Sequence, residues 1–329
     1  MVALTFRGTS VARGIERIDL GMALLVVPVL QGLGFCLEAA GWRGILASLG
    51  ERASFRRVLR VRIMSEAISQ SLPLGVLLAE GSKPVLLRTW TGIAVPIGSA
   101  SVAARKYSLI ATQATLLAVV AVFGAAPLER FGAGIPGGGV TLRAIIGTGA
   151  GVLALSAAAS GRALCRGRIA AKLRALLARI PLARSVATRH ENAFSETDAA
   201  AERYFGRPLG ARALSALPFL FAWCVEAFET WFLLRIVGVE IGLGVAFCLE
   251  VPLGLLRSVA FFTPAGLGVQ DLGYATALAS LGTPDATSAA LAFVLLKRSK
   301  EALWIAVGYV LFVLGRPMTT GGTHEALNG

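Results

Sequence analysis

The chain has 329 residues, of which 55% are apolar and only 16% charged, and its mean hydropathy is +0.71. Soluble domains are typically about 25% charged, so this composition excludes an ordinary soluble protein and indicates an all-α polytopic membrane protein. The net charge of +13 does not indicate nucleic-acid binding, because the basic residues cluster between apolar runs, where they hold loops against anionic cytoplasmic lipid.

The first half of the chain, residues 1–160, predicts five apolar segments. They cover residues 18–37, 58–79, 84–104, 109–126 and 140–159. The first is interpreted as a retained span rather than a signal peptide, since it has no clear small-residue cleavage site. Proline and charged residues interrupt the second and third, which are therefore expected to be broken or re-entrant helices.

Residues 161–212 form a basic cytoplasmic linker with the densest Lys and Arg cluster of the chain. Within it, apolar residues recur at helical spacing from Ile169 to Ile180, which predicts an amphipathic helix. This helix either lies on an anionic lipid surface or packs on the helix bundle.

The second half, residues 213–315, predicts further segments separated by a glycine-rich break. Apolar segments cover residues 214–237, 241–262, 272–281 and 286–314. Charged residues interrupt the last segment near its middle, and a disordered tail is expected over residues 316–329. The chain is therefore predicted to be a single membrane domain with seven or eight crossings, two of the segments being broken.

Two segments share a pattern at an offset of 191 residues. Each has a proline, a glycine two residues later and an acid seven residues after the proline: Pro73, Gly75 and Glu80, and again Pro264, Gly266 and Asp271. The same offset pairs Lys106 with Lys297 and Gly124 with Gly315. Broken helices at matching positions in two halves point to a transporter's substrate site, the alternative being ordinary loop ends. The sequence leaves open whether such a repeat is parallel or inverted.

Several ionisable residues lie inside apolar runs, where each costs about 2.5–3.5 kcal/mol on insertion scales and is usually kept for function. They are Glu66, Glu226, Glu229, Arg235, Glu250, Arg257, Lys297, Arg298 and Glu301. Glu250 and Arg257 share a helix face and could flank a common cavity. Pairs such as Lys297 and Glu301 could instead neutralise each other and only fix packing. Cations with nearby acids suit an anionic or zwitterionic lipid headgroup.

The sequence contains no motif for nucleotide hydrolysis, metalloprotease chemistry or a serine nucleophile elbow. Its cysteines and two histidines lack metal-ligand spacing. We therefore expect neither enzymatic activity nor a cofactor or metal.

The run from Phe261 to Gly273, FFTPAGLGVQDLG, resembles the signature of a flippase-like family that includes the transmembrane part of lysylphosphatidylglycerol synthase. Residues 226–231 and 296–304, with Glu250 and Arg257, resemble its hopanoid-biosynthesis-associated, HpnL-like branch. This resemblance covers most of the chain and implies movement of lipids, with hopanoids as the suggested cargo. Asp271 stands where the family commonly has Glu.

These observations predict a bacterial inner-membrane lipid translocase for a hopanoid or phospholipid. Its headgroup is expected near the two breaks, where Gly268 and Gln270 also lie. Arg257, Lys297 and Arg298 would contact the head, while acids such as Glu250 would accept hydrogen bonds or carry a proton. Two alternatives remain: a scaffold for a lipid-modifying enzyme and an intramembrane lipid-modifying enzyme. A lipid-biosynthesis partner or a second copy of the chain are the expected protein partners.

Overall fold

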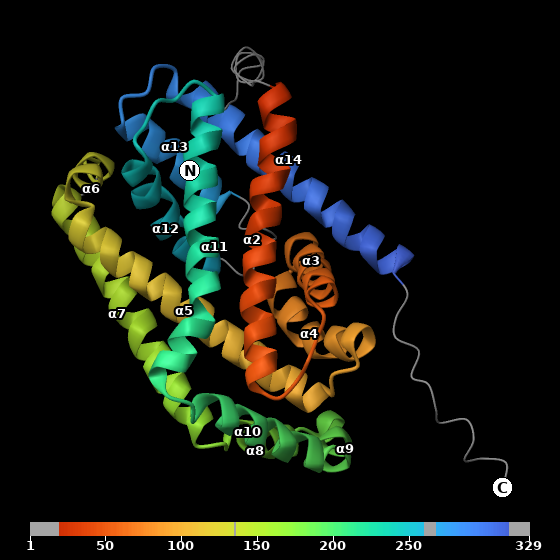
Figure 1. Cartoon of the computed structure of the whole chain (residues 1–329). Helices are drawn as coiled ribbons and strands as arrows, with labels where there is room; N and C mark the ends of the chain where they lie inside the picture. The colour runs from red at the N-terminus through yellow and green to blue at the C-terminus, as the bar shows by residue number, and fades with distance from the viewer. Residues whose placement is uncertain (1–19, 135, 260–267, 316–329) are drawn as a thin grey trace, which may run out of the picture.

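The computed structural model describes residues 20–134, 136–259 and 268–315, and every regular element within these ranges is a helix (Figure 1). The predicted helical membrane fold is therefore confirmed. Among the described residues, three helices are long and apolar enough to cross a bilayer, namely α5, α7 and α11. The larger number of crossings and the re-entrant segments stay predictions.

In the described part of the first half, the chain forms six helices. They are α2 (Leu20–Ser48), α3 (Phe55–Ser71), α4 (Gly75–Thr91), α5 (Val95–Phe123), α6 (Ala125–Phe131) and α7 (Gly138–Cys165). The predicted first span ended at residue 37, but α2 continues for three more turns. It does so because Phe35, Ala39, Trp42 and Leu46 continue the helical spacing and are buried.

The expected interruptions of the second and third apolar segments are present, and each lies between two consecutive helices. The chain breaks at residues 72–74, where Leu74 has a φ of 54°, and again at residues 92–94. Pro73 lies in the first break, and its missing backbone N–H disfavours continuation of the helix there. Gly92 has a φ of 79°, a conformation that glycine adopts without steric cost, and it ends α4.

The basic linker forms three short helices across one end of the bundle: α8 (Ile169–Leu177), α9 (Pro181–Arg189) and α10 (Glu191–Phe205) (Figure 1). The helix predicted over residues 169–180 is therefore present as α8 but ends at Leu177, three residues earlier. In α8, Ile169, Leu173 and Leu176 are exposed and Ala170 is buried. Its apolar face therefore does not pack on the rest of the described chain.

Asp198 of α10 fixes the start of α8. Its two carboxylate oxygens accept hydrogen bonds from the backbone N–H groups of Ala170 and Ala171 at 2.8 and 2.9 Å. We expect Asp198→Ala to destabilise α8 by about 1 kcal/mol, since these N–H groups lose their cap. Amide hydrogen exchange in α8 should then speed up about fivefold. The exposed Glu196 of the same helix provides the control, and equal exchange in Asp198→Ala and Glu196→Ala would contradict the assignment.

The second half consists of α11 (Leu209–Ile236), α12 (Leu243–Val259), α13 (Val269–Ser280) and α14 (Ala286–Leu314). The bounds of α14 agree with the last predicted segment. Its central charged residues, Lys297, Arg298, Lys300 and Glu301, do not interrupt the helix. They occur in one continuous 29-residue helix because all four have ion partners within the described structure.

The helices of the two halves correspond at the same offset of 191 residues. Shifting α5 by this offset reproduces the bounds of α14, and the shifted bounds of α2, α3 and α4 fall within three residues of α11, α12 and α13. In Figure 1, α2 and α11 run in opposite directions, and so do α5 and α14. The second half therefore repeats the helix order of the first with its helices reversed.

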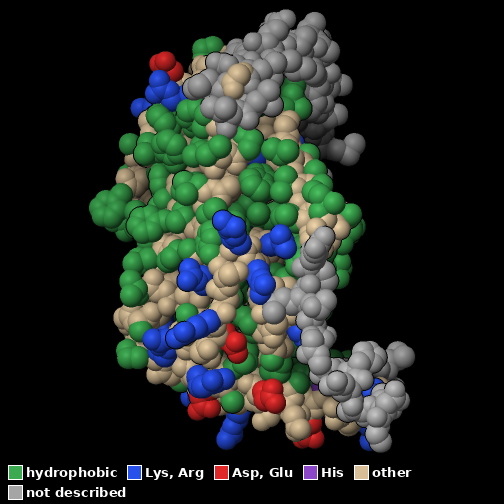
Figure 2. All heavy atoms as spheres, turned by 45° about the vertical axis from the view of Figure 1, so that its right-hand side comes forward, with side chains coloured by type: hydrophobic (Ala, Val, Ile, Leu, Met, Phe, Trp, Pro, Cys, Tyr) green, Lys and Arg blue, Asp and Glu red, His purple; other side chains and the backbone are tan. Residues whose placement is uncertain are grey.

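Close helix contacts hold the halves together. A Cβ on Gly41 of α2 would lie 2.6 Å from the Phe219 ring of α11, and one on Gly308 of α14 would lie 2.5 Å from Ala67 of α3. Glycine is needed at both contacts because the helices approach so closely. Figure 2 shows hydrophobic side chains over the upper part of one face and Lys and Arg gathered over the lower part. Such a distribution fits a bilayer-facing band above a cytoplasmic end.

Candidate functional site

A cavity of about 270 Å³ lies between the two halves, lined by residues of α2, α3, α4, α5, α11 and α14. Ionisable side chains from both halves line it. Among the described residues, the acids are Glu38, Glu66, Glu80, Glu226, Glu229 and Glu301. The bases are Arg62, Lys83, Arg105, Lys106, Lys297 and Lys300. The cavity thus brings twelve charged groups into the interior of an apolar bundle.

The contact between Gly41 and Phe219 sets the relative level of α2 and α11. Because the helices run in opposite directions, Glu38 of α2 is level with Ala222 of α11. Glu229 lies seven residues further along α11, which corresponds to roughly 10 Å at 1.5 Å per residue. Glu38 and Glu229 are themselves 191 residues apart. Equivalent carboxylates of the two halves therefore lie at opposite ends of the cavity.

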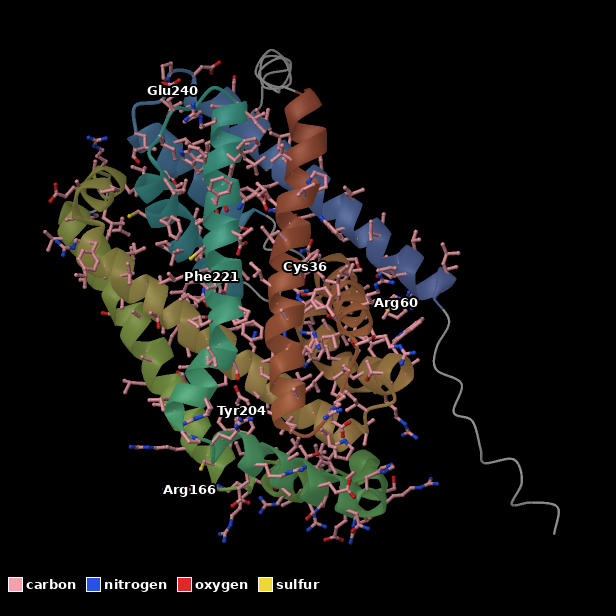
Figure 3. The ribbon with its side chains drawn as sticks, viewed as in Figure 1. Cys36, Arg60, Arg166, Tyr204, Phe221 and Glu240 are labelled. Atoms are coloured by element: carbon pink, nitrogen blue, oxygen red, sulfur yellow. The ribbon has the colours of Figure 1, made fainter. Side chains whose placement is uncertain are left out.

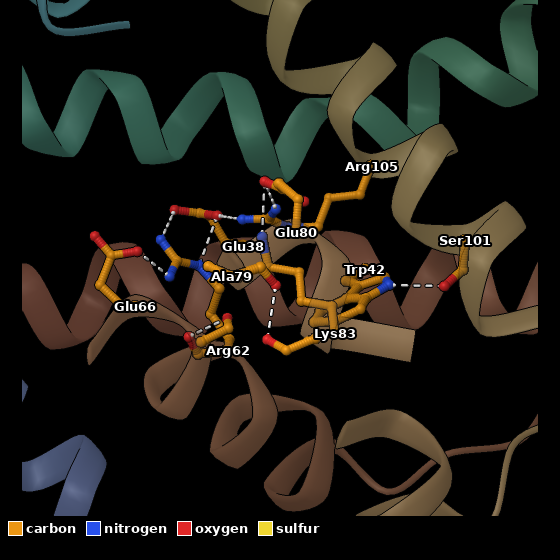
Figure 4. Close-up of polar contacts among 11 residues, drawn as sticks. Glu38, Trp42, Arg62, Glu66, Ala79, Glu80, Lys83, Ser101 and Arg105 are labelled. Carbon is orange, nitrogen blue, oxygen red and sulfur yellow. Dashed lines mark hydrogen bonds and ion pairs between the residues drawn. The ribbon is translucent and has the colours of Figure 1, made fainter. Parts of the chain in front are cut away.

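Around Glu38, a network joins four helices of the first half (Figure 4). Arg62 of α3 binds both carboxylate oxygens of Glu38 at 2.8 Å and binds Glu66 at 2.5 Å. Arg105 of α5 also binds Glu38, and it lies 3.7 Å from Glu80 of α4. These bidentate, charge-assisted contacts stabilise the buried carboxylate and fix the positions of both arginines.

Lys83 completes this network on α4. Its Nζ lies 2.8 Å from Glu80, one helical turn away, and its side chain is almost fully buried. Trp42 of α2 donates a hydrogen bond to Ser101 of α5 next to the network. The first-half wall of the cavity is therefore held by ion pairs and hydrogen bonds between helices that are distant in sequence.

A second network joins α11, α12, α13 and α14. Glu250 accepts two hydrogen bonds from Lys297 at 2.9 Å, one from Thr230 at 2.6 Å and one from Tyr274 at 2.7 Å. Lys300, one turn further along α14, pairs with Glu229. Both carboxylates are at most 3% exposed. Buried charges of this kind persist only when they are paired and hydrogen-bonded.

Asp271, the acid that follows the second predicted break, belongs to a third group of ion-paired residues. Asp271, in the first turn of α13, binds Arg298 at 2.6 Å, and Arg298 binds Glu301 at 2.6 Å. Asp271 also accepts a hydrogen bond from the backbone N–H of Gly268, which caps the helix. Gln270 is buried and donates to the Tyr274 hydroxyl at 2.9 Å. This end of α13 is thereby tied to the centre of α14.

The model of the lysylphosphatidylglycerol synthase transmembrane region matches residues 1–298 of the chain. The chain belongs to this family. Its resemblance at the FFTPAGLGVQDLG run is thereby confirmed at family level. A search of curated proteins finds no match to the chain. The lysylphosphatidylglycerol synthase transmembrane region is a membrane domain related to lipid handling, which agrees with a bundle that encloses a charged cavity.

Part of the family signature lies outside the residues that the structure describes. Pro264 and Gly266 lie outside the described residues, as does the side chain of Arg257, although its backbone belongs to α12. The contribution of these three to the site stays a prediction. In the first half, Pro73 and Gly75 lie at the break between α3 and α4 and shape it, and neither is among the residues that line the cavity.

The contacts of Lys297 and Glu250 in this family member differ from those that helical spacing favours. The helical spacing of Lys297 and Glu301 favoured pairing within α14, but Lys297 binds Glu250 on α12 and Glu301 binds Arg298. Glu250 is not among the residues that line this cavity, and it binds Lys297, which does line it. For Lys297, a contact between helices replaces the one that spacing along α14 favours, whereas Arg298 and Glu301 pair within α14 at a spacing of three residues.

Several charged residues that line the cavity in this family member are not among the predicted site residues. They include Glu38, Arg62, Lys83, Arg105 and Lys300. The overlooked signal was the position of each charge beside buried apolar residues at helical spacing. Glu38, for example, lies between the buried Phe35 and Trp42.

Proposed function

We propose that this protein moves a lipid between the two leaflets of the bacterial cytoplasmic membrane, with the lipid headgroup in the charged cavity. The supporting observation is the set of twelve ionisable side chains that line a cavity inside a bundle of apolar helices. Charges are rare and costly within membrane segments, where they mark the pathways of ions and substrates. The linker helices α8 to α10 then lie on the cytoplasmic side, as their basic residues require.

In this proposal the cavity provides polar contacts along the route of the headgroup, while the acyl chains stay among apolar side chains. Ion pairs such as Glu38 with Arg62 and Glu229 with Lys300 hold the helices around the cavity. A polar headgroup replaces some of these contacts with its own, so it does not cross hydrocarbon unsolvated. The process involves no covalent step, and the cargo is a phospholipid or a hopanoid-type lipid.

The test is transbilayer movement in vesicles that contain the purified protein. Lipids with a fluorescent acyl chain, together with a hopanoid-type lipid, are reconstituted, and the loss of outer-leaflet fluorescence after addition of a membrane-impermeant quencher is followed. We expect at least one lipid to move about tenfold faster than in protein-free vesicles, which corresponds to about 1.4 kcal/mol of barrier. If no lipid class moves faster, the translocase proposal fails.

One observation favours a scaffold as the second candidate. The exposed apolar side chains of α8, including Leu173 and Leu176, could dock a lipid-modifying enzyme. Deletion of residues 169–180 separates the two functions. A scaffold loses its enzyme partner in this variant, whereas a translocase continues to move lipid in purified vesicles.

A further inference from the structure

Five side chains that line the cavity each have a buried polar atom without a hydrogen-bond partner in the described structure. The donors are Nε and Nη1 of Arg105, Nε2 of Gln113 and Nε1 of Trp223. The acceptors are Oε2 of Glu80 and Oε1 of Gln70. An unsatisfied buried polar atom costs about 1–3 kcal/mol, so six of them around one cavity indicate that a polar ligand satisfies them.

The unsatisfied donors define where an anionic group binds. Arg105 is 3% exposed and uses its Nη2 for Glu38, while its Nη1 lies 3.7 Å from Glu80, beyond hydrogen-bonding distance. The remaining N–H groups, on Nε and Nη1, point from different edges of the guanidinium because Cδ lies between them, so each donates separately. The Nη1 group suits an anionic oxygen such as that of a phosphate.

The side chains that carry the neutral donors both approach α12. The Gln113 amide nitrogen and the Trp223 ring are both within 4 Å of the Cβ position of Gly254 on α12. Gln113 is 5% exposed and lies two helical turns beyond Arg105 on α5. Uncharged donors at this position suit the ester carbonyl oxygens that follow the phosphate in a glycerophospholipid.

The unsatisfied acceptors define where a cationic group binds. Oε2 of Glu80 and Oε1 of Gln70 can accept hydrogen bonds only from N–H or O–H groups. A primary ammonium carries three N–H donors and a positive charge, whereas a quaternary ammonium has no N–H to donate. Glu80 also contacts Arg105, so the anion and the cation would bind side by side.

We infer that the cavity accepts a zwitterionic phospholipid headgroup that carries a phosphate and a primary ammonium. This inference rests on the proposed translocase function and names its substrate class. The charge balance supports it, because six acids and six bases line the cavity among the described residues. A headgroup without net charge keeps this balance, while an anionic one adds an uncompensated charge in a medium of low dielectric constant.

The experiment compares three lipids that share the same fluorescent acyl chain, in vesicles of one fixed composition that contain the purified full-length chain. Phosphatidylethanolamine has the primary ammonium, phosphatidylcholine has a quaternary ammonium and phosphatidylglycerol has no cation. We expect phosphatidylethanolamine to move about tenfold faster than phosphatidylglycerol, with phosphatidylcholine between them. In Glu80→Gln, which removes the charge and keeps the shape, the advantage of phosphatidylethanolamine over phosphatidylcholine should disappear.

Glu240→Gln is the matched control, because Glu240 is exposed at the end of the molecule opposite Tyr204 and Arg166 (Figure 3). It should keep the wild-type preference. Equal movement of all three lipids would overturn the inferred substrate class and leave the translocase function intact, whereas no movement of any lipid would overturn the function itself. A Glu80→Gln variant that is folded, as judged by its unfolding midpoint in detergent, and keeps the preference overturns the assignment of Glu80.

Discussion

Lys300→Met is expected to lower the free energy of unfolding by about 3–5 kcal/mol, the usual cost of removing one partner of a buried ion pair. Lys300 and Glu229 are 6% and 1% exposed, and they pair with each other between α14 and α11. Without the ammonium, the Glu229 carboxylate stays buried and loses its closest counter-charge. The unfolding midpoint of the detergent-solubilised protein measures the effect.

Two further variants show whether loss of the Lys300–Glu229 ion pair causes the lower free energy of unfolding. Lys106→Met makes the same change on α5 at an exposed residue of the cavity rim and should alter stability by no more than about 0.5 kcal/mol. Lys300→Met combined with Glu229→Met removes both charges and should restore most of the lost stability. If Lys300→Met and Lys106→Met have equal unfolding midpoints, the stability of the buried Glu229 carboxylate does not depend on Lys300.

Arg62→Gln is expected to slow lipid movement at least about tenfold while the protein stays folded. Arg62 contacts Glu38 and Glu66, so its loss leaves both carboxylates without this cation and gives the cavity a net negative charge. The fold should persist, because Arg105 still pairs with Glu38 and Gln70 still donates to Glu66. The initial rate of movement in vesicles, divided by the amount of folded protein, measures the effect.

Arg56→Gln is the control for this variant, since Arg56 is an exposed arginine of the same helix. It should keep the wild-type rate. Movement at the wild-type rate in Arg62→Gln would show that the charge of Arg62 is not needed for transport.

The sequence predicted the helical membrane fold and most helix positions because composition, periodicity and breaks at proline and glycine are local signals. The bounds of α14 and the break after Ser71 were read directly from such signals. The end of α2 was missed because Glu38 and Arg43 interrupt its apolar run, although the buried face continues to Leu46. Charges near buried residues mark a site in a membrane helix rather than its end.

The partners of the charged residues could not be predicted in the same way. Helical spacing offers Glu301 to Lys297, but the bound partner, Glu250, is 47 residues away on α12. Arg105 and Glu38 are 67 residues apart. Such pairs depend on how whole helices cross, and one sequence contains no local signal for this. Of the predicted site residues, Glu66, Glu80, Glu226 and Glu229 line the cavity, but their contacts were not predictable from the sequence.

The helices of the second half keep the order of the first half but run in the opposite direction, and this has a consequence for the energetics of the proposed transport. Because α2 and α11 have opposite directions and carry equivalent glutamates, each face of the membrane meets a similar half of the protein. Interchanging the conformations of the two halves would give an arrangement of comparable free energy that opens to the opposite face. In the proposed translocase, the protein itself would then favour neither import nor export. The direction of net lipid flux is then set by the difference in lipid concentration between the leaflets, or by whatever process consumes the lipid on one side.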